Sequence, residues 1–186
     1  MYQYSTVEKN IFQKNIKTYV IIDLAINEDI WIYITQIFKL KYYSLANDED
    51  HKDLEFVAPY IVELTEKSDF LYWLLKEGYG NYWMIFLQTD KRIEKLKEQF
   101  SDFFYQKIEV KINNNIEYQE SYFAFYDPRV LMGYMNVLNE TDKIDFFDGI
   151  DCFLCENIFN EKELLKYKLD TNNKVAVNKL EIKGNV

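Results

Sequence analysis

The sequence has only one histidine and two cysteines among its 186 residues, which limits the chemistry open to it. His51 lies in an acidic polar segment with no marked nucleophile nearby, so nothing there indicates a catalytic triad. A single distant histidine and one pair of cysteines do not assemble a tetrahedral zinc site. We therefore expect no metal, no cofactor and no enzymatic activity.

The two cysteines, Cys152 and Cys155, stand three residues apart in a Cys-Phe-Leu-Cys run. A redox pair with this spacing usually opens a helix, whose N-terminus lowers the thiol pKa. The run here has the pattern of a strand, in which residues three apart point to opposite faces. The sequence therefore predicts two structural thiols.

Basic stretches are also missing from the chain. It carries 22 Lys and Arg against 31 Asp and Glu, a formal net charge of −9. A nucleic-acid binder normally presents a basic face, because phosphate contacts dominate its affinity. The lysines between residues 91 and 107 are instead interleaved with Glu94 and Glu98, as on a solvated helix. We expect no nucleic-acid partner, and the acidic charge favours a basic or apolar protein partner.

Long apolar runs are absent as well. No stretch approaches the ~18–20 apolar residues of a membrane-spanning helix. Residues 1–15 are polar and lack the apolar central region of a secretory signal peptide. We expect a cytoplasmic protein that is not inserted in a membrane.

The hydrophobic periodicity predicts strands that alternate with helices. Continuous apolar runs indicate buried strands at residues 19–24, 82–87 and 150–156, and residues 60–64 fit either a short strand or a helix start. Helical spacing predicts helices at residues 27–38, 69–76, 93–104, 128–138 and 141–147, and a hairpin at residues 107–112 and 117–125. The order predicts an α/β fold: a single compact domain with a mixed β-sheet and flanking helices. From Glu161 onward the chain is charged, with one alternating stretch at residues 174–182.

Residues 121–131 form the most informative segment, Ser-Tyr-Phe-Ala-Phe-Tyr-Asp-Pro-Arg-Val-Leu. Asp127 is placed to cap a helix that begins at Pro128, a residue suited to the first helical position. Arg129 then lies in the first turn, where the helix dipole disfavours a cation. An arginine at that position indicates a specific carboxylate partner or an exposed side chain. A second carboxylate, Asp23, interrupts the apolar run at residues 19–24 and needs a donor, a proton or a place at the strand's end.

The segment resembles the Phe-Tyr-Asp-Pro-Arg-Val-Leu signature of a bacterial family of type VI secretion effector chaperones, also called adaptors, long catalogued as a domain of unknown function. Five further motifs follow the family's order, four upstream of the signature and one downstream. The framework residues in these motifs and in the signature are Asp23 in the opening strand, Pro59 in Ala-Pro-Tyr, Trp73 in the tryptophan-leucine helix, Trp83 in the glycine-tryptophan strand, and Pro128. Downstream, Phe146-Phe147-Asp148-Gly149 is similar to the family's double phenylalanine before a glycine. The resemblance covers roughly residues 18–157.

This resemblance implies an adaptor domain at residues 18–157, an N-terminal extension at residues 1–17 and a C-terminal tail at residues 158–186. Two positions depart from the family pattern. Ala124 stands where an arginine is usual, and Gln99-Phe100-Ser101 aligns with His-Leu-Arg. The resemblance therefore supports the fold more strongly than any basic pocket of other members.

The resemblance implies that the protein binds a secreted effector and helps load it onto the spike protein of the secretion system. We predict partner contacts at Tyr126, Asp127, Arg129 and Tyr134, in the signature segment and its helix. The alternative is a small acidic immunity protein that neutralises a toxin through an acidic loop, Asp48, Glu49, Asp50 and Asp53. An enzyme that uses Asp23 and Asp127 is a third reading without supporting spacing.

Overall fold

A seven-stranded antiparallel sheet forms the centre of the computed structural model, which describes residues 4–47, 54–112 and 115–182. The strand order is β2-β3-β1-β4-β7-β8-β9. The strands are β1 (Lys17–Asp23), β2 (Tyr42–Ser44), β3 (Pro59–Glu63), β4 (Met84–Thr89), β7 (Cys152–Glu156), β8 (Glu163–Leu169) and β9 (Val175–Glu181). The predicted α/β class and the single compact domain are confirmed.

Every pair of neighbouring strands in this sheet is antiparallel, although the sequence predicted a mixed sheet. The reason lies in the position of β1. β3 and β4 run in the same direction and are joined through a helix, as in a βαβ unit, but β1 lies between them and pairs antiparallel with both. Alternation of strands and helices along the chain does not reveal such an inserted strand.

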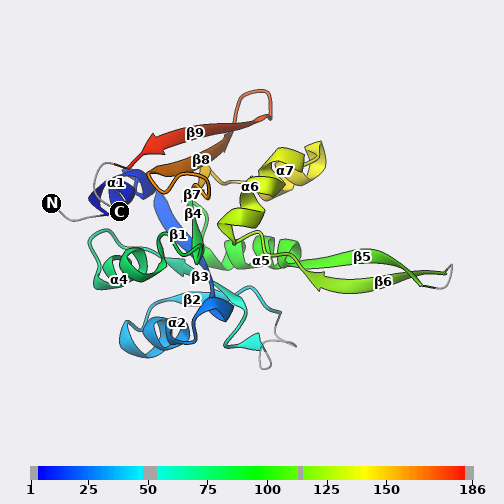
Figure 1. The fold of residues 1–186 in the computed structure, drawn as a ribbon, viewed down its shortest axis with the longest axis horizontal. Helices are drawn as coiled ribbons and strands as arrows, with labels where there is room; N and C mark the ends of the chain where they lie inside the picture. Colours follow the sequence, from blue (N-terminus) through cyan, green and yellow to red (C-terminus); the bar gives the residue numbers. More distant parts are fainter. Residues whose placement is uncertain (1–3, 48–53, 113–114, 183–186) are drawn as a thin grey trace.

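Helices cover both faces of the sheet (Figure 1). One face carries α1 (Ser5–Ile11), the short 3₁₀ turn η1 (Leu24–Ile26), α2 (Asp29–Ile32) with the π-helical turn η2 (Tyr33–Ile37), and α4 (Asp69–Gly78). The other face carries α5 (Ile93–Phe104), α6 (Pro128–Val137) and α7 (Glu140–Phe146). None of the helices in the described part of the chain is long and apolar enough to cross a membrane.

The central strands β1 and β4 are buried on both sides, which explains their continuous apolar runs. Val20 and Ile22 of β1 face the core beneath α1 and α4, while Tyr19 and Ile21 face the core beneath α5 and α6. The sequence left residues 60–64 open between a strand and a helix. The structure places residues 60–63 in β3, which ends at Glu63. The predicted helix at residues 93–104 is α5, with the same ends.

Both ends of the chain contribute to these layers. In the predicted N-terminal extension, Val7 and Ile11 of α1 are fully buried against the sheet. In the predicted C-terminal tail, β8 pairs with β7 and β9 pairs with β8. Leu164 and Leu165 are buried, but the charged residues that surround them hide this pattern in the sequence.

A two-stranded hairpin of β5 (Tyr105–Ile112) and β6 (Asn115–Tyr122) projects from the body of the protein (Figure 1). The predicted hairpin is confirmed, but its second strand ends at Tyr122 instead of Phe125. Phe125 is fully buried beneath α5 and α7. The chain therefore leaves the hairpin and enters the core immediately before the signature aspartate.

Candidate functional site: the signature corner

The signature residues lie at one end of the sheet, where α6 begins. Asp127 is the N-cap of α6, and its Oδ1 accepts a hydrogen bond of 2.8 Å from the backbone N–H of Arg129. Pro128 occupies the first turn. Both predicted roles are confirmed. The first N–H groups of a helix need an acceptor, which Asp127 supplies, and the first turn tolerates the missing N–H of a proline.

The carboxylate partner expected for Arg129 is Asp127 itself. The Arg129 Nε donates to both oxygens of Asp127, at 2.9 and 3.0 Å, and Nη2 donates to Oδ2. Asp127 is buried, whereas 55% of the Arg129 side chain is exposed. The hydrogen bond and charge of Asp127 raise the pKa of Arg129. The corner thus presents to solvent a fixed cation whose counter-ion lies beneath it.

Asp23 lies at the same end of the sheet, as the last residue of β1. Its Oδ1 caps η1 by accepting the N–H of Ala25 at 2.9 Å, and its own N–H donates to the carbonyl of Trp83. Burial is the main cause that raises the pKa of Asp23, and the charge of nearby Asp127 raises it further. The structure therefore brings Asp23, Asp127 and Arg129 together, although the first is a hundred residues away along the chain.

Two of the framework residues join this corner through β1. Pro59 is the register partner of Asp23 in the pairing of β1 with β3. Trp83 is buried and accepts the Asp23 N–H through its carbonyl. Trp73 is only half-buried and stacks on Tyr33, with ring centroids 4.1 Å apart. The aromatic framework residues thus pack against one core.

Glu156 is a residue of this corner that the sequence analysis missed. It ends β7 and is buried, and its carboxylate accepts the N–H groups of Gly80 at 2.8 Å and Tyr82 at 2.9 Å. Burial raises the pKa of Glu156 to about 7. Gly80 and Tyr82 both have positive φ, 89° and 61°, so this turn is held in an unusual shape by one carboxylate. The available signal was an acid within a run that is predicted to be a buried strand, as for Asp23.

Tyr126, where the sequence analysis predicts a partner contact, is a buried residue. Only 7% of Tyr126 is exposed, and its ring packs against Phe104 and Phe125. Tyr134 is half-buried between Phe123 and Phe146, and burial raises its pKa to about 12. The strongly exposed aromatic rings near the signature are on the hairpin instead, at Tyr118 and Tyr122.

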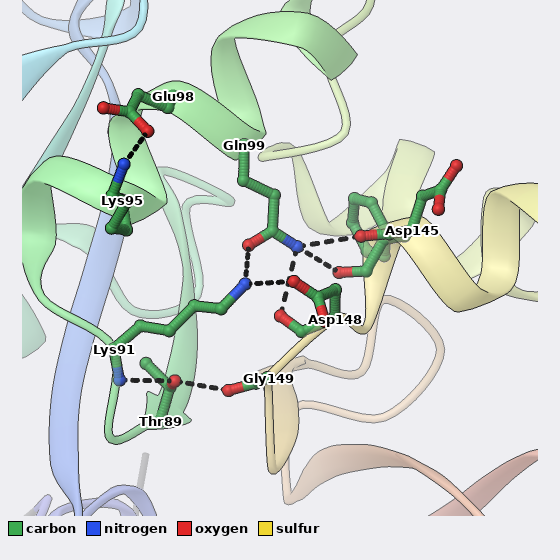
Figure 2. Close-up of polar contacts among 9 residues, drawn as sticks. Thr89, Lys91, Lys95, Glu98, Gln99, Asp145, Asp148 and Gly149 are labelled. Carbon is green, nitrogen blue, oxygen red and sulfur yellow. Dashed lines mark hydrogen bonds and ion pairs between the residues drawn. The ribbon is translucent and has the colours of Figure 1, made fainter.

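One of the two departures from the family pattern, residues 99–101, lies away from this corner, along α5. The Nε2 of Gln99 donates to the carbonyl of Asp145 at 2.9 Å, and its Oε1 accepts from the Lys91 Nζ at 3.0 Å (Figure 2). Lys91 also forms an ion pair with Asp148. Ser101 donates its hydroxyl to the carbonyl of Leu45 at 2.9 Å. These uncharged side chains therefore fasten α5 to neighbouring loops.

The surface beside this network is acidic. An open cavity of about 300 Å³ lies between α5 and the end of α7, lined by Gln99, Asp102, Phe103, Gln106, Asp145 and Asp148. Three of those residues are aspartates, so the cavity lacks the character of a basic pocket.

The half-buried Ala124 stands before Phe125, where the family pattern has its other arginine.

Gly149, the last residue of the double-phenylalanine motif, lies where the backbone conformation favours a glycine. Its φ is +62°, and a Cβ at this position would collide with the side chain of Lys91. Its carbonyl accepts the hydroxyl of Thr89, which in turn accepts the Lys91 N–H (Figure 2). A glycine satisfies both the backbone conformation and the close approach.

The two cysteines lie on opposite faces of β7, as predicted. Cys152 belongs to the core beneath α1 and α4, and Cys155 to the core beneath α5 and α6. Both are free thiols and buried, and burial raises the pKa of Cys152 to about 11. Within the described residues no group of three or more His, Cys, Asp or Glu side chains could hold a metal ion. His51 and the acidic loop of Asp48, Glu49, Asp50 and Asp53 lie outside the described residues.

The corner belongs to an α/β domain in which the ordered motifs between residues 19 and 149 lie on the sheet or on segments packed against it. Residues 18–143 match a family model described as a domain of unknown function, DUF4123, and the chain belongs to this family. The family is associated with adaptors of type VI secretion effectors. Searches of curated proteins and of solved structures gave no match.

Proposed function

We propose that this protein is an adaptor that binds a type VI secretion effector and helps load it onto the spike protein. The observation that carries this proposal is the family match over residues 18–143, which contains the complete Asp127-Pro128-Arg129 signature. An adaptor needs a scaffold that keeps its shape when a partner binds. The apolar cores on both faces of the sheet and the hydrogen bonds of Asp127 and Glu156 at the corner fit this need.

The charged groups of the corner fit a scaffold role better than catalysis. Asp127 is occupied by Arg129 and by the start of α6, and Glu156 by two backbone N–H groups. Asp23 caps η1. A general acid or base must instead reach a substrate with its titrating atom. We therefore propose that the protein acts by binding, without turnover.

The test is co-purification of the full chain with the product of the neighbouring effector gene and with the spike protein. The adaptor function predicts a complex with the effector that also contains or recruits the spike protein. Apolar contacts should dominate, so the complex should persist when salt rises from about 0.1 M to about 0.5 M, where exposed charges are screened. A complex with the effector alone that suppresses its toxicity and dissociates in salt would support the immunity role and contradict the adaptor.

A further inference from the structure

The hairpin of β5 and β6, here called the arm, is rooted firmly in the core. α5 ends at Phe104 and β5 starts at Tyr105 without a loop. The rings of Phe104 and Tyr122 stack with centroids 4.9 Å apart, and the Phe123 N–H donates to the Phe104 carbonyl. Eight residues in each strand give the arm a length of roughly 27 Å. The root therefore fixes the direction in which the arm leaves the body.

The arm exposes apolar side chains along β6. Because directly paired residues share a face, the register places Ile116, Tyr118 and Tyr122 on one face, together with the charged residues of β5. Ile116 is 64% exposed, Tyr118 69% and Tyr122 53%. A two-stranded hairpin is only marginally stable in water, and a further strand is the usual way to complete such a sheet.

The two edges of the arm differ in charge. Among the described strands, β5 and β6 pair only with each other. β5 carries Lys107 and Lys111 beside one acid, Glu109, and lysine is a residue that protects an edge strand from further pairing. β6 has no lysine, and its charged residues are Glu117 and Glu120. The edge of β6 is therefore the more open of the two and has acidic character.

We propose that the edge of β6 binds an extended segment of the effector as a third strand. The segment would place apolar side chains beside Ile116, Tyr118 and Tyr122, and a basic side chain near Glu117 or Glu120. Main-chain hydrogen bonds give affinity in this mode of recognition, and the alternating side chains give specificity. The basic character follows from the acidic edge and from the net charge of −9. This inference rests on the proposed function, since it takes the effector as the partner.

The first experiment compares full-length variants for capture of the neighbouring effector. The double variant Ile116→Lys/Tyr118→Lys puts two lysines on β6, where they repel a basic segment and protect the edge. Its control is Ile108→Lys, an exposed apolar position on β5 whose side chain points to the opposite face. We expect the double variant to bind about tenfold more weakly or worse, and the control to stay within about twofold of the parent. All three proteins should melt at similar temperatures, because the substituted side chains are exposed.

The second experiment measures amide hydrogen exchange of the full chain with and without the effector. A third strand protects the outward-pointing N–H groups of β6, so alternate amides of Asn115–Tyr122 should slow. The amides of β9, the edge strand at the β8 side of the main sheet, should not change.

The outcomes separate this inference from the adaptor function. Capture of the effector by the parent and by the double variant alike would overturn the arm proposal and leave the adaptor function standing. Equal losses in the double variant and in Ile108→Lys would also overturn it, as would protection of β9 instead of β6. Protection of β6 that grows with protein concentration in the absence of effector would assign the edge to a second copy of this chain. No capture by the parent would overturn both proposals.

Discussion

The guanidinium of Arg129 lies 5.3 Å from the ring centroid of Tyr82, while the same group donates hydrogen bonds to Asp127. Tyr82 is in turn held by the bond from its backbone N–H to Glu156. One largely exposed cation therefore links the start of α6 to the turn before β4, and a buried carboxylate fixes that turn from the other side. These contacts explain why motifs distant in the sequence meet in one corner of the fold.

The double role of Asp127 gives the first prediction. Asp127→Ala removes the cap of α6 and the partner of Arg129, so it should cost more than the ~0.5–2 kcal/mol typical of a lost cap. Asp127→Asn keeps a capping oxygen but loses the charge, and it should cost less than the alanine variant. The matched control is Asn139→Ala, which removes the cap of α7 at an exposed site. Urea unfolding measures all three. A urea unfolding curve of Asp127→Ala that coincides with that of the parent would contradict the structural role.

Glu156 predicts a pH dependence of stability. Its pKa is about 7 in the folded protein and ~4.3 in an unfolded chain. Between about pH 4.3 and pH 7 the folded state therefore keeps a proton on this group that the unfolded state has lost. Stability from this group is therefore present below about pH 4 and is lost as the pH rises through 7. Relative to Glu156→Gln, the parent should lose on the order of 3 kcal/mol between pH 4 and pH 8.

The measurement is the free energy of unfolding of the two proteins at matched pH values. The comparison with Glu156→Gln removes the contributions of other groups, including Asp23, whose pKa is also raised. A difference that stays constant with pH would show that Glu156 titrates normally and is not held as a buried carboxylate.

Gly149 and Gly133 offer a matched pair for a third prediction. Gly149 has a positive φ and contacts Lys91, so Gly149→Ala should destabilise the protein by about 1–3 kcal/mol. Gly133 lies in α6, and a Cβ there would meet nothing within 4 Å. Gly133→Ala should therefore stabilise the protein by up to about 1 kcal/mol, because alanine favours the helix. Thermal melts that rank the two variants in the opposite order would refute the account of the motif.

The cysteines provide a fourth prediction. Cys152 and Cys155 face different cores, so they cannot act on one substrate or bind one metal ion together. The double variant Cys152→Ala/Cys155→Ala should retain effector binding, although small cavities in the core will lower its stability. Mass spectrometry of the native parent should find no bound zinc. A stoichiometric zinc content would overturn the structural role of the two thiols.

The parts of the fold that the sequence predicted are those governed by local rules. The spacing of Ile93, Leu96 and Phe100 defined α5, and the pair Asp127-Pro128 defined the start of α6. The opposite orientation of the two cysteines followed from the period of a strand. Each of these depends on residues within a few positions of one another.

What the sequence did not predict depends on distant partners. The insertion of β1 between β3 and β4 is a choice among pairings that all bury similar apolar runs. The burial of Tyr126 depends on where the arm enters the core, and Glu156 became notable only through its bonds to Gly80 and Tyr82. β8 was missed because Glu163, Lys166 and Lys168 interrupt its apolar residues, and β9 lies on the alternating stretch at residues 174–182, which was noted but not assigned to a strand.

The burial of Tyr126 and the exposure of Tyr118 give a final prediction with two readouts. Tyr126→Ala removes a buried ring that packs against Phe104 and Phe125, and it should cost about 3–5 kcal/mol of stability. Tyr118→Ala removes a ring that is mostly in solvent, so its melt should match the parent while its binding of the effector weakens. Tyr126→Phe is the control, because it keeps the ring and should retain most of the stability and the binding. If Tyr126→Ala folded as stably as the parent and lost only effector binding, Tyr126 would be a contact residue and its place in the core would be wrong. If Tyr118→Ala bound the effector as tightly as the parent, the arm would not be the surface that the effector meets.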